Sequence, residues 1–148
     1  MSLAELSAED RQELNDLIIE FAWRVDHGQA DTVHELVTDD IEMRLSQATM
    51  LGREAVTAWG RKRSTVERTT SHVMSNVRFY GLTSDRVESD SLAIIFRHSG
   101  SGMGAARPWA VTEYQDVFVR SDGRWKFSRR VSSDVFFSEE ANEIRNKL

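Results

Sequence analysis

Two side chains that lie far apart in this sequence, His72 and Asp26, have the types needed for acid–base chemistry. His72 begins a stretch with strand-like alternation, and an imidazole that opens into an apolar cavity can exchange protons near neutral pH. Asp26 comes at the end of a predicted amphipathic helix, where the helix dipole disfavours a carboxylate. A buried Asp26 beside His72 would orient the ring and stabilise its charged form. Purely structural roles are the alternative: His72 only bonds a backbone carbonyl, and Asp26 only ends a helix.

Several other polar and aromatic residues are candidates for contacts with a substrate. The amide of Asn76 and the phenol of Tyr114 can donate a hydrogen bond to an oxyanion that develops on the substrate. Large aromatic rings suit the wall of an apolar pocket, and a second histidine, His98, is expected on the strand next to His72. The predicted substrate-binding residues are Asn76, Trp23, Phe96, His98, Trp109, Tyr114 and Arg129.

The sequence gives little support for chemistry that depends on a metal or a cofactor. It has no cysteine, which excludes Cys nucleophiles and Cys-ligated clusters, and its four histidines lack metal-site spacing. The glycine-rich stretch 100–105 matches the pattern G-x-G-x-x-[GA], but a strand follows it where dinucleotide binding needs a helix. A pocket flap is the better interpretation of this loop. No G-x-S-x-G element is present, and we expect neither a metal nor a cofactor.

Length and charge narrow the class of protein further. A chain of 148 residues with 40% apolar and 29% charged residues suits a single domain over residues 1–148. The net charge of −5 argues against nucleic-acid binding, and we interpret the basic run Arg61, Lys62, Arg63 and Arg68 as a solvated helix face. Apolar runs are far shorter than the roughly 20 residues that span a bilayer, and no signal peptide is visible. We therefore expect a cytoplasmic protein that binds neither nucleic acid nor membrane.

The first half of the sequence predicts helices with a strand pair between them. Apolar residues at three- and four-residue steps predict the first helix, and Ser7 with Asp10 resembles a capping box at its start. The stripe consists of Leu14, Leu17, Ile18, Phe21, Ala22 and Val25. The expected elements are this helix ending near Gly28, a short helix from Asp31, strands at Ile41–Leu45 and Thr49–Leu51, and a helix from Arg53 to about Glu67.

The second half predicts four long antiparallel strands, followed by a short polar helix or frayed tail at residues 139–148. Turn signals separate the strands, and the Asp122-Gly123 pair is the strongest of them. This order of elements predicts an α+β domain with helices segregated on one face of a mostly antiparallel sheet. The expected strands are His72–Tyr80, Arg86–His98, Trp109–Arg120 and Trp125–Phe137.

Alternation along these strands predicts which side chains share a face. The expected sets are His72, Met74, Asn76, Arg78 and Tyr80; Leu92, Ile94, Phe96 and His98; Tyr114, Asp116 and Phe118; and Trp125, Phe127, Arg129, Val131 and Val135. Because both faces carry apolar residues, the second face is expected to be covered, either by closure into a cone or by a partner subunit. We therefore expect a homo-oligomer, a dimer or a trimer.

The segments together resemble SnoaL-like members of the NTF2-like superfamily over roughly residues 8–137. The first helix ends in Asp26, a polar turn and Asp31, and Asp39-Asp40 precedes the first strand. A strand with the spacing His-x-x-x-Asn carries His72 and Asn76. The segments that carry the resemblance are "LIIEFAWRVDHGQADTVHELVTDDIEM", "LGREAV", "TSHVMSNVRFYG" and "YQDVFVRSDGRWKFSRR", the last with Tyr114, Asp116, Trp125 and Arg129.

The resemblance implies a cone of strongly bent, mixed or antiparallel sheet, closed by three helices around a pocket. Members of this superfamily include scytalone dehydratase, ketosteroid isomerase, polyketide cyclases, β subunits of ring-hydroxylating dioxygenases and plain binding modules. His72 matches a catalytic histidine of the scytalone dehydratase-like members. The chain departs from that enzyme in the first helix, where Ala22-Trp23 replaces a Tyr-Asp pair.

Two functions are compatible with these observations. The first is a cofactor-free lyase or isomerase of the dehydratase or cyclase kind, acting on a small, cyclic, apolar substrate. His72 would be its general acid or base and Asp26 the partner that orients the ring. The second is a non-catalytic protein that carries a ligand or serves as a structural subunit, as the dioxygenase β subunits do. Contact between Asp26 and His72 is the feature that the first function requires.

Overall fold

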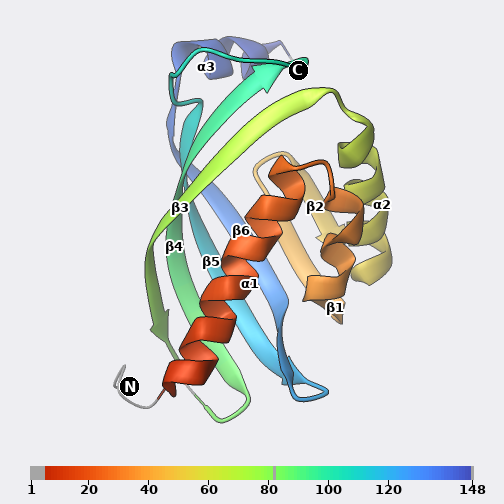
Figure 1. Ribbon diagram of the computed structural model, residues 1–148, viewed down its shortest axis with the longest axis vertical. Coiled ribbons are helices and arrows are strands. Elements are labelled where there is room, and N and C mark those ends of the chain that lie inside the picture. The colour runs from red at the N-terminus through yellow and green to blue at the C-terminus, as the bar shows by residue number, and fades with distance from the viewer. Residues whose placement is uncertain (1–5, 82, 148) are drawn as a thin grey trace.

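The computed structural model describes residues 6–81 and 83–147, which form one curved sheet with helices packed against it (Figure 1). The helix α1 crosses the face of the sheet, and the long strand β3 arches from the α2 end of the molecule towards the start of α1 (Figure 1). The elements are α1 (Ala8–Asp26), the 3₁₀-helix η2 (Ala30–Leu36), β1 (Val37–Leu45), β2 (Ala48–Leu51), α2 (Arg53–Thr65), β3 (Arg68–Tyr80), β4 (Arg86–Ser99), β5 (Ala110–Ser121), β6 (Arg124–Phe137) and α3 (Glu139–Asn146).

The described strands form a mixed sheet in the order β2-β1-β6-β5-β4-β3. Neighbouring strands run antiparallel except β1 and β6, which pair in parallel although they lie far apart in the sequence. The prediction of an α+β domain with a mostly antiparallel sheet is therefore confirmed. The strand β3 forms one edge of the sheet, with β4 as its neighbour.

The first helix follows the sequence pattern closely. The Ser7 hydroxyl accepts the backbone N–H of Asp10 at 3.0 Å and caps the helix, as predicted. Beyond its end Gly28 has a φ of 72°, a left-handed conformation that glycine adopts without strain. The helix buries Leu14, Ile18, Phe21, Ala22 and Val25 against the sheet.

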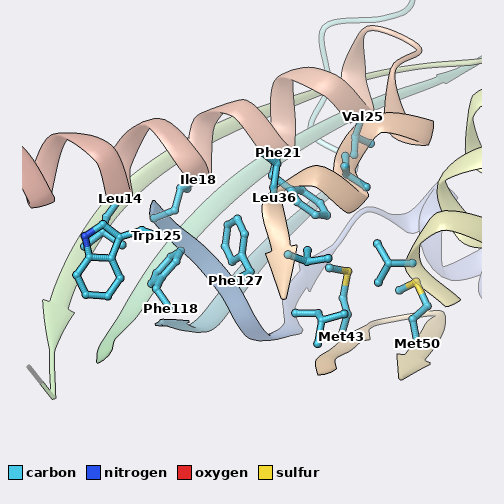
Figure 2. Close-up of a cluster of buried hydrophobic side chains, with 14 of the residues drawn as sticks. Leu14, Ile18, Phe21, Val25, Leu36, Met43, Met50, Phe118, Trp125 and Phe127 are labelled. Atoms are coloured by element: carbon cyan, nitrogen blue, oxygen red, sulfur yellow. The ribbon is translucent and has the colours of Figure 1, made fainter. Parts of the chain in front are cut away.

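Aromatic side chains from three elements form the centre of the core. Figure 2 shows Phe21 of α1 pointing toward Phe127 of β6, with Phe118 of β5 beside it. The ring centroids of Phe118 and Phe127 lie 4.7 Å apart, and those of Phe21 and Phe127 lie 5.7 Å apart in an edge-to-face arrangement. Burial of each such ring contributes about 1.5–3 kcal/mol. These contacts hold α1 in place on β5 and β6.

A bulge in β3 changes the face of the residues that follow it. The pairing of β3 with β4 shifts between Ser75 and Arg78. Asn76 lies inside this shift with a φ of 54°, a left-handed conformation that asparagine tolerates better than most residues. Asn76 is exposed, so the prediction that His72 and Asn76 share a face is wrong. The extra residue breaks the two-residue alternation on which that prediction depended.

A second bulge has the same effect in β6. The register with β5 shifts around Ser128, which leaves one extra residue in β6. Phe127 before the bulge and Arg130 after it are both buried, whereas Arg129 is exposed. The predicted alignment of Arg129 with Phe127 is therefore wrong, and Arg130 is the arginine that enters the core.

In β4 the residues with odd numbers face the helices. Buried or cavity-lining positions are Val87, Ser89, Ser91, Ala93, Ile95 and Arg97. The predicted set that includes Phe96 and His98 lies on the opposite face of the sheet, because successive side chains of a strand point to opposite sides. Both faces of this strand are apolar, so alternation alone did not show which of them is turned inward.

The connections agree with the sequence. The Asp122-Gly123 turn joins β5 and β6, with φ values of 52° and 74° that suit a tight hairpin. The polar segment at the C-terminal end is helical from Glu139 to Asn146. Among the described residues, no helix combines the length and the apolar character needed to cross a membrane.

Candidate active site

Asp26 and His72 lie side by side where the C-terminal end of α1 meets the first half of β3. The carboxylate oxygen Oδ1 of Asp26 is 2.6 Å from Nδ1 of the His72 ring. The other oxygen, Oδ2, accepts the backbone N–H of His72 at 2.8 Å, and the Thr70 hydroxyl donates to Oδ1 at 2.7 Å. The fold thus brings together two residues separated by 46 positions and holds the carboxylate with three hydrogen bonds.

The surroundings of Asp26 keep its carboxylate ionised. Burial alone would raise the pKa of Asp26, but hydrogen bonds from His72 and Thr70 and the charge of His72 hold that pKa below its ordinary value. An ionised carboxylate can only accept hydrogen bonds, so Nδ1 of His72 carries the proton that is shared with Asp26. When the ring is neutral, the second ring nitrogen, Nε2, has a free lone pair, as a general base requires.

His72 of this pair lines a cavity of about 220 Å³. The side chain of His72 is 16% exposed and that of Asp26 is 9% exposed, so the pair is largely shielded from bulk water. The wall combines aromatic and aliphatic groups with charged ones. The lining residues are Val25, Leu45, Ser46, Gln47, Ala48, Trp59, Arg63, Arg68, Thr70, His72, Ile95, Arg97, Trp109, Ala110, Thr112, Tyr114, Ser132, Asp134 and Phe137.

Beyond Tyr114 the sheet contains a buried pair of opposite charges. Asp116 on β5 lies across from Arg130 on β6, with 3.4 Å between Oδ1 and Nε. Burial raises the pKa of Asp116 to about 6, although the charge of Arg130 opposes this rise. The Arg130 guanidinium lies 4.3 Å from the ring centroid of Tyr114 and 4.8 Å from that of Phe127. Burial also raises the pKa of Tyr114, so its hydroxyl stays protonated and can donate a hydrogen bond.

Residues 6–131 match the family model of the SnoaL-like domain. The chain belongs to the SnoaL-like domain family. No match to this SnoaL-like domain was found among curated proteins.

Solved structures with the same fold give this SnoaL-like domain an NTF2-like, or cystatin-like, architecture. One is a protein of Novosphingobium aromaticivorans provisionally assigned as a scytalone dehydratase, with a TM-score of 0.79 and 18% identity over 93% of this chain and 91% of that chain. An NTF2-like protein of the same organism has a TM-score of 0.72 and 24% identity, and covers 97% and 96%. Hexachlorocyclohexane dehydrochlorinase LinA-type3 of Novosphingobium barchaimii has a TM-score of 0.72 and 20% identity, and covers 88% and 89%.

Two of the predicted substrate-binding residues of this SnoaL-like domain share the cavity with His72. Trp109 and Tyr114 both line it. Asn76, exposed at the β3 bulge, lines a separate hollow on the side of the sheet where Glu113 and Gln115 lie. Because β3 changes face before Asn76, this amide is not presented to the cavity that contains His72.

The other predicted binding residues also lie outside this cavity. Trp23 is 55% exposed and stacks on His27 with 3.8 Å between ring centroids, because it falls off the apolar stripe of α1. Phe96 and His98 point away with the outer face of β4, and Arg129 lies on the surface with Nε 3.8 Å from Glu42. Trp59 on α2 takes the place in the wall that Trp23 was expected to fill.

Several cavity residues were not identified from the sequence. Arg63 and Arg68 line the cavity, so the interpretation of the whole basic run as a solvated face is wrong for these two. Arg97 lines the same end of the cavity, and Asp134 accepts a hydrogen bond from the Thr112 hydroxyl at 2.6 Å. Arg97 comes two positions after Ile95 and therefore shares its face of β4. This spacing is the sequence signal that could have identified Arg97. Within the described part of the chain, no three His, Asp or Glu residues are grouped so that they could hold a metal ion.

Proposed function

We propose that this SnoaL-like domain is a cofactor-free lyase that removes a proton from carbon and eliminates a small leaving group from a cyclic substrate. The observation that carries the proposal is the Asp26–His72 pair, whose His72 lines a cavity. The names of two similar structures, a dehydratase and a dehydrochlorinase, describe eliminations of water and of hydrogen chloride. This likeness supports the reaction class and leaves the substrate open.

In this mechanism, Nε2 of His72 takes a proton from a carbon of the substrate. The electron pair of that C–H bond forms a new C=C bond with the neighbouring carbon while the leaving group departs from that carbon with its own bonding pair. His72 becomes an imidazolium, which the ionised Asp26 stabilises through the 2.6 Å contact with Nδ1. The proton then passes to the leaving group or to solvent, and the base is restored.

Other cavity groups suit the rest of this reaction. The protonated Tyr114 hydroxyl can donate a hydrogen bond to a substrate carbonyl, which lowers the barrier for removal of a proton from the adjacent carbon. The rings of Trp59 and Trp109 offer flat apolar surfaces to a cyclic substrate. Return of the proton to a different carbon would make the same arrangement an isomerase.

Deuterium exchange tests the proton-transfer step without knowledge of the leaving group. The protein is incubated in D₂O with a panel of cyclic ketones and β-hydroxyketones, and exchange at carbons next to the carbonyl is followed by proton NMR. We expect enzyme-dependent exchange for at least one member, and we expect His72→Gln to slow it by about 100-fold or more. His98→Gln is the matched control, because His98 lies one strand away on the outer face.

Asp26→Asn should retain part of the activity, with exchange slowed by about 10- to 100-fold, because an amide can no longer stabilise the imidazolium by charge. Circular dichroism confirms that each variant is folded. Ligands that bind the wild-type protein without any catalysed exchange would overturn the proposal in favour of a ligand carrier. Equal exchange rates for His72→Gln and His98→Gln would also overturn it.

A further inference from the structure

Three arginines gather at one end of the cavity. Arg63 comes from the last turns of α2, Arg68 is the first residue of β3, and Arg97 lies near the end of β4. In the sheet, Arg97 is directly opposite Thr70, whose hydroxyl is bonded to Asp26. The arginine cluster, defined as Arg63, Arg68 and Arg97, is therefore adjacent to the acid–base pair and belongs to the same cavity.

The arginine cluster lacks direct carboxylate partners within residues 6–81 and 83–147. Arg63 donates one hydrogen bond, to the neutral hydroxyl of Thr70 at 3.1 Å. Arg97 has a buried Nε without a hydrogen-bond partner, and its guanidinium lies 4.5 Å from the ring centroid of Trp109. Other arginines of this chain form close pairs, such as Arg24 with Glu35 at 2.7 Å and Arg53 with Asp39 at 2.6 Å.

The pKa values of two of these arginines are lowered, because their positive charges are partly buried and lie close together. Burial lowers the pKa of Arg63 and of Arg97, and the neighbouring charge of Arg68 lowers both further. Asp26 and Glu140 oppose these effects from a distance, and Asp26 is already bonded to His72. Like charges brought together beside a cavity without close counter-charges are the arrangement expected of an anion-binding site.

The opposite side of the cavity has a different character. Asp134 on β6 lines it and accepts the Thr112 hydroxyl at 2.6 Å. The strand β5 separates β6 from β4, so Asp134 and Arg97 belong to strands about 10 Å apart at the usual strand spacing. The cavity therefore has a positive end on β3 and β4 and a negative group on β6, which would orient an anionic ligand in one direction.

We propose that the arginine cluster binds a carboxylate of the substrate, so that the ligand class is a small cyclic organic acid. Its ring would lie against Trp109, and the carbon that loses a proton would face His72. Guanidinium groups form paired hydrogen bonds with carboxylates, and the cavity that these arginines line has a volume of about 220 Å³. The inference rests on the proposed function only in assigning this acid as the substrate, because binding is measured separately from turnover.

Isothermal titration calorimetry tests the proposal with matched ligands of equal shape. Cyclohexanecarboxylate and benzoate are compared with the neutral cyclohexanecarboxamide and benzamide, and with benzyl phosphate and inorganic phosphate. We expect the carboxylates to bind about 10- to 100-fold more tightly than the amides, with a preference that weakens as salt is raised. Tighter binding of benzyl phosphate than of benzoate would overturn the assignment to a carboxylate, and equal binding of acids and amides would refute an anion site.

Variants of the arginines localise the effect. Arg97→Gln should abolish the preference for the acid, whereas Arg97→Lys should keep part of it if the charge is what matters. Arg61→Gln is the control, because Arg61 is an exposed arginine of α2 outside the cavity lining. Loss of the preference in Arg61→Gln, or its retention in Arg97→Gln, would overturn the proposal.

The inactive base variant separates this inference from the proposed function. His72→Gln should bind benzoate with an affinity close to that of the wild-type protein, because the arginine cluster is intact. A wild-type protein that prefers the acids but never exchanges a carbon-bound proton would refute the lyase and leave the anion site standing. Catalysed exchange in neutral ketones, without any preference for acids, would refute the anion site and leave the lyase standing.

Discussion

The buried carboxyl of Asp116 makes the stability of this fold depend on pH in a direction opposite to that of most acids. Burial raises its pKa from 3.8 to about 6 in the folded protein, whereas in the unfolded chain it returns to its ordinary value. The folded state therefore holds this proton more tightly, so the free energy of unfolding decreases as the pH rises from about 4 to above 6. A shift of about two pKa units at 1.36 kcal/mol per unit corresponds to about 3 kcal/mol.

The substitution Asp116→Asn isolates this contribution, because asparagine has nearly the same shape and does not titrate. Other carboxyl groups titrate in both proteins and cancel when the two unfolding free energies are subtracted. We expect the stability of the wild-type protein relative to Asp116→Asn to fall by about 2 kcal/mol between pH 4 and pH 7, because part of the full effect is already lost below pH 4. Urea denaturation followed by tryptophan fluorescence at half-unit steps of pH measures this difference.

Asp122→Asn is a matched control at an exposed turn, where its φ of 52° suits asparagine as well as aspartate. The difference between this variant and the wild-type protein should stay flat over the same range. If instead the wild-type protein gains stability over Asp116→Asn as the pH rises, the reasoning is refuted. The attraction of Arg130 at 3.4 Å would then outweigh the cost of burying the charge.

Three further substitutions test local features of the fold by thermal or chemical denaturation. Gly60→Ala should destabilise the protein by about 1–3 kcal/mol, because a Cβ there would overlap the backbone carbonyl of Ala30; stability equal to wild type would contradict the tight packing of α2 on η2. Ser7→Ala should cost about 1 kcal/mol through loss of the helix cap at Asp10, and no change in the midpoint would rule out that cap. Asn76→Gly should be nearly neutral whereas Asn76→Val destabilises by about 1–3 kcal/mol, since a β-branched residue resists a φ of 54°; equal effects would argue against the bulge.

The sequence predicted the elements of this fold well because their signals are local. The capped stripe of α1, the Asp122-Gly123 turn and the alternation of four long strands each depend on neighbours a few residues away. The resemblance to SnoaL-like proteins supplied the arrangement of these elements, which no local pattern contains. Together they predicted that Asp26 and His72 are candidates for one site, although only the fold shows them in contact.

Which face of the sheet each side chain occupies was harder to predict, because one extra residue in a strand reverses the face of every residue after it. Nothing in the sequence around Asn76 or Ser128 shows that alternation breaks there, so alternation predicts the wrong face for Asn76 and favours Arg129 where Arg130 is buried. The prediction that the basic run is a solvated helix face was wrong for Arg63 and Arg68 for a different reason. Whether Arg63 meets solvent or a cavity depends on β3 and β4, which lie far along the chain.

The hydrogen bond between Asp26 and the backbone of His72 has a consequence for the edge of the sheet. The strand β3 lies at the edge of the sheet, and free N–H groups on an edge strand invite pairing with another chain. Here Oδ2 of Asp26 occupies the N–H of His72, and Oδ1 accepts the hydroxyl of Thr70 two residues earlier. The carboxylate thus occupies one backbone N–H of an edge strand that could otherwise pair with another chain. A side chain at position 26 that cannot accept this hydrogen bond would leave the N–H of His72 open on the edge strand.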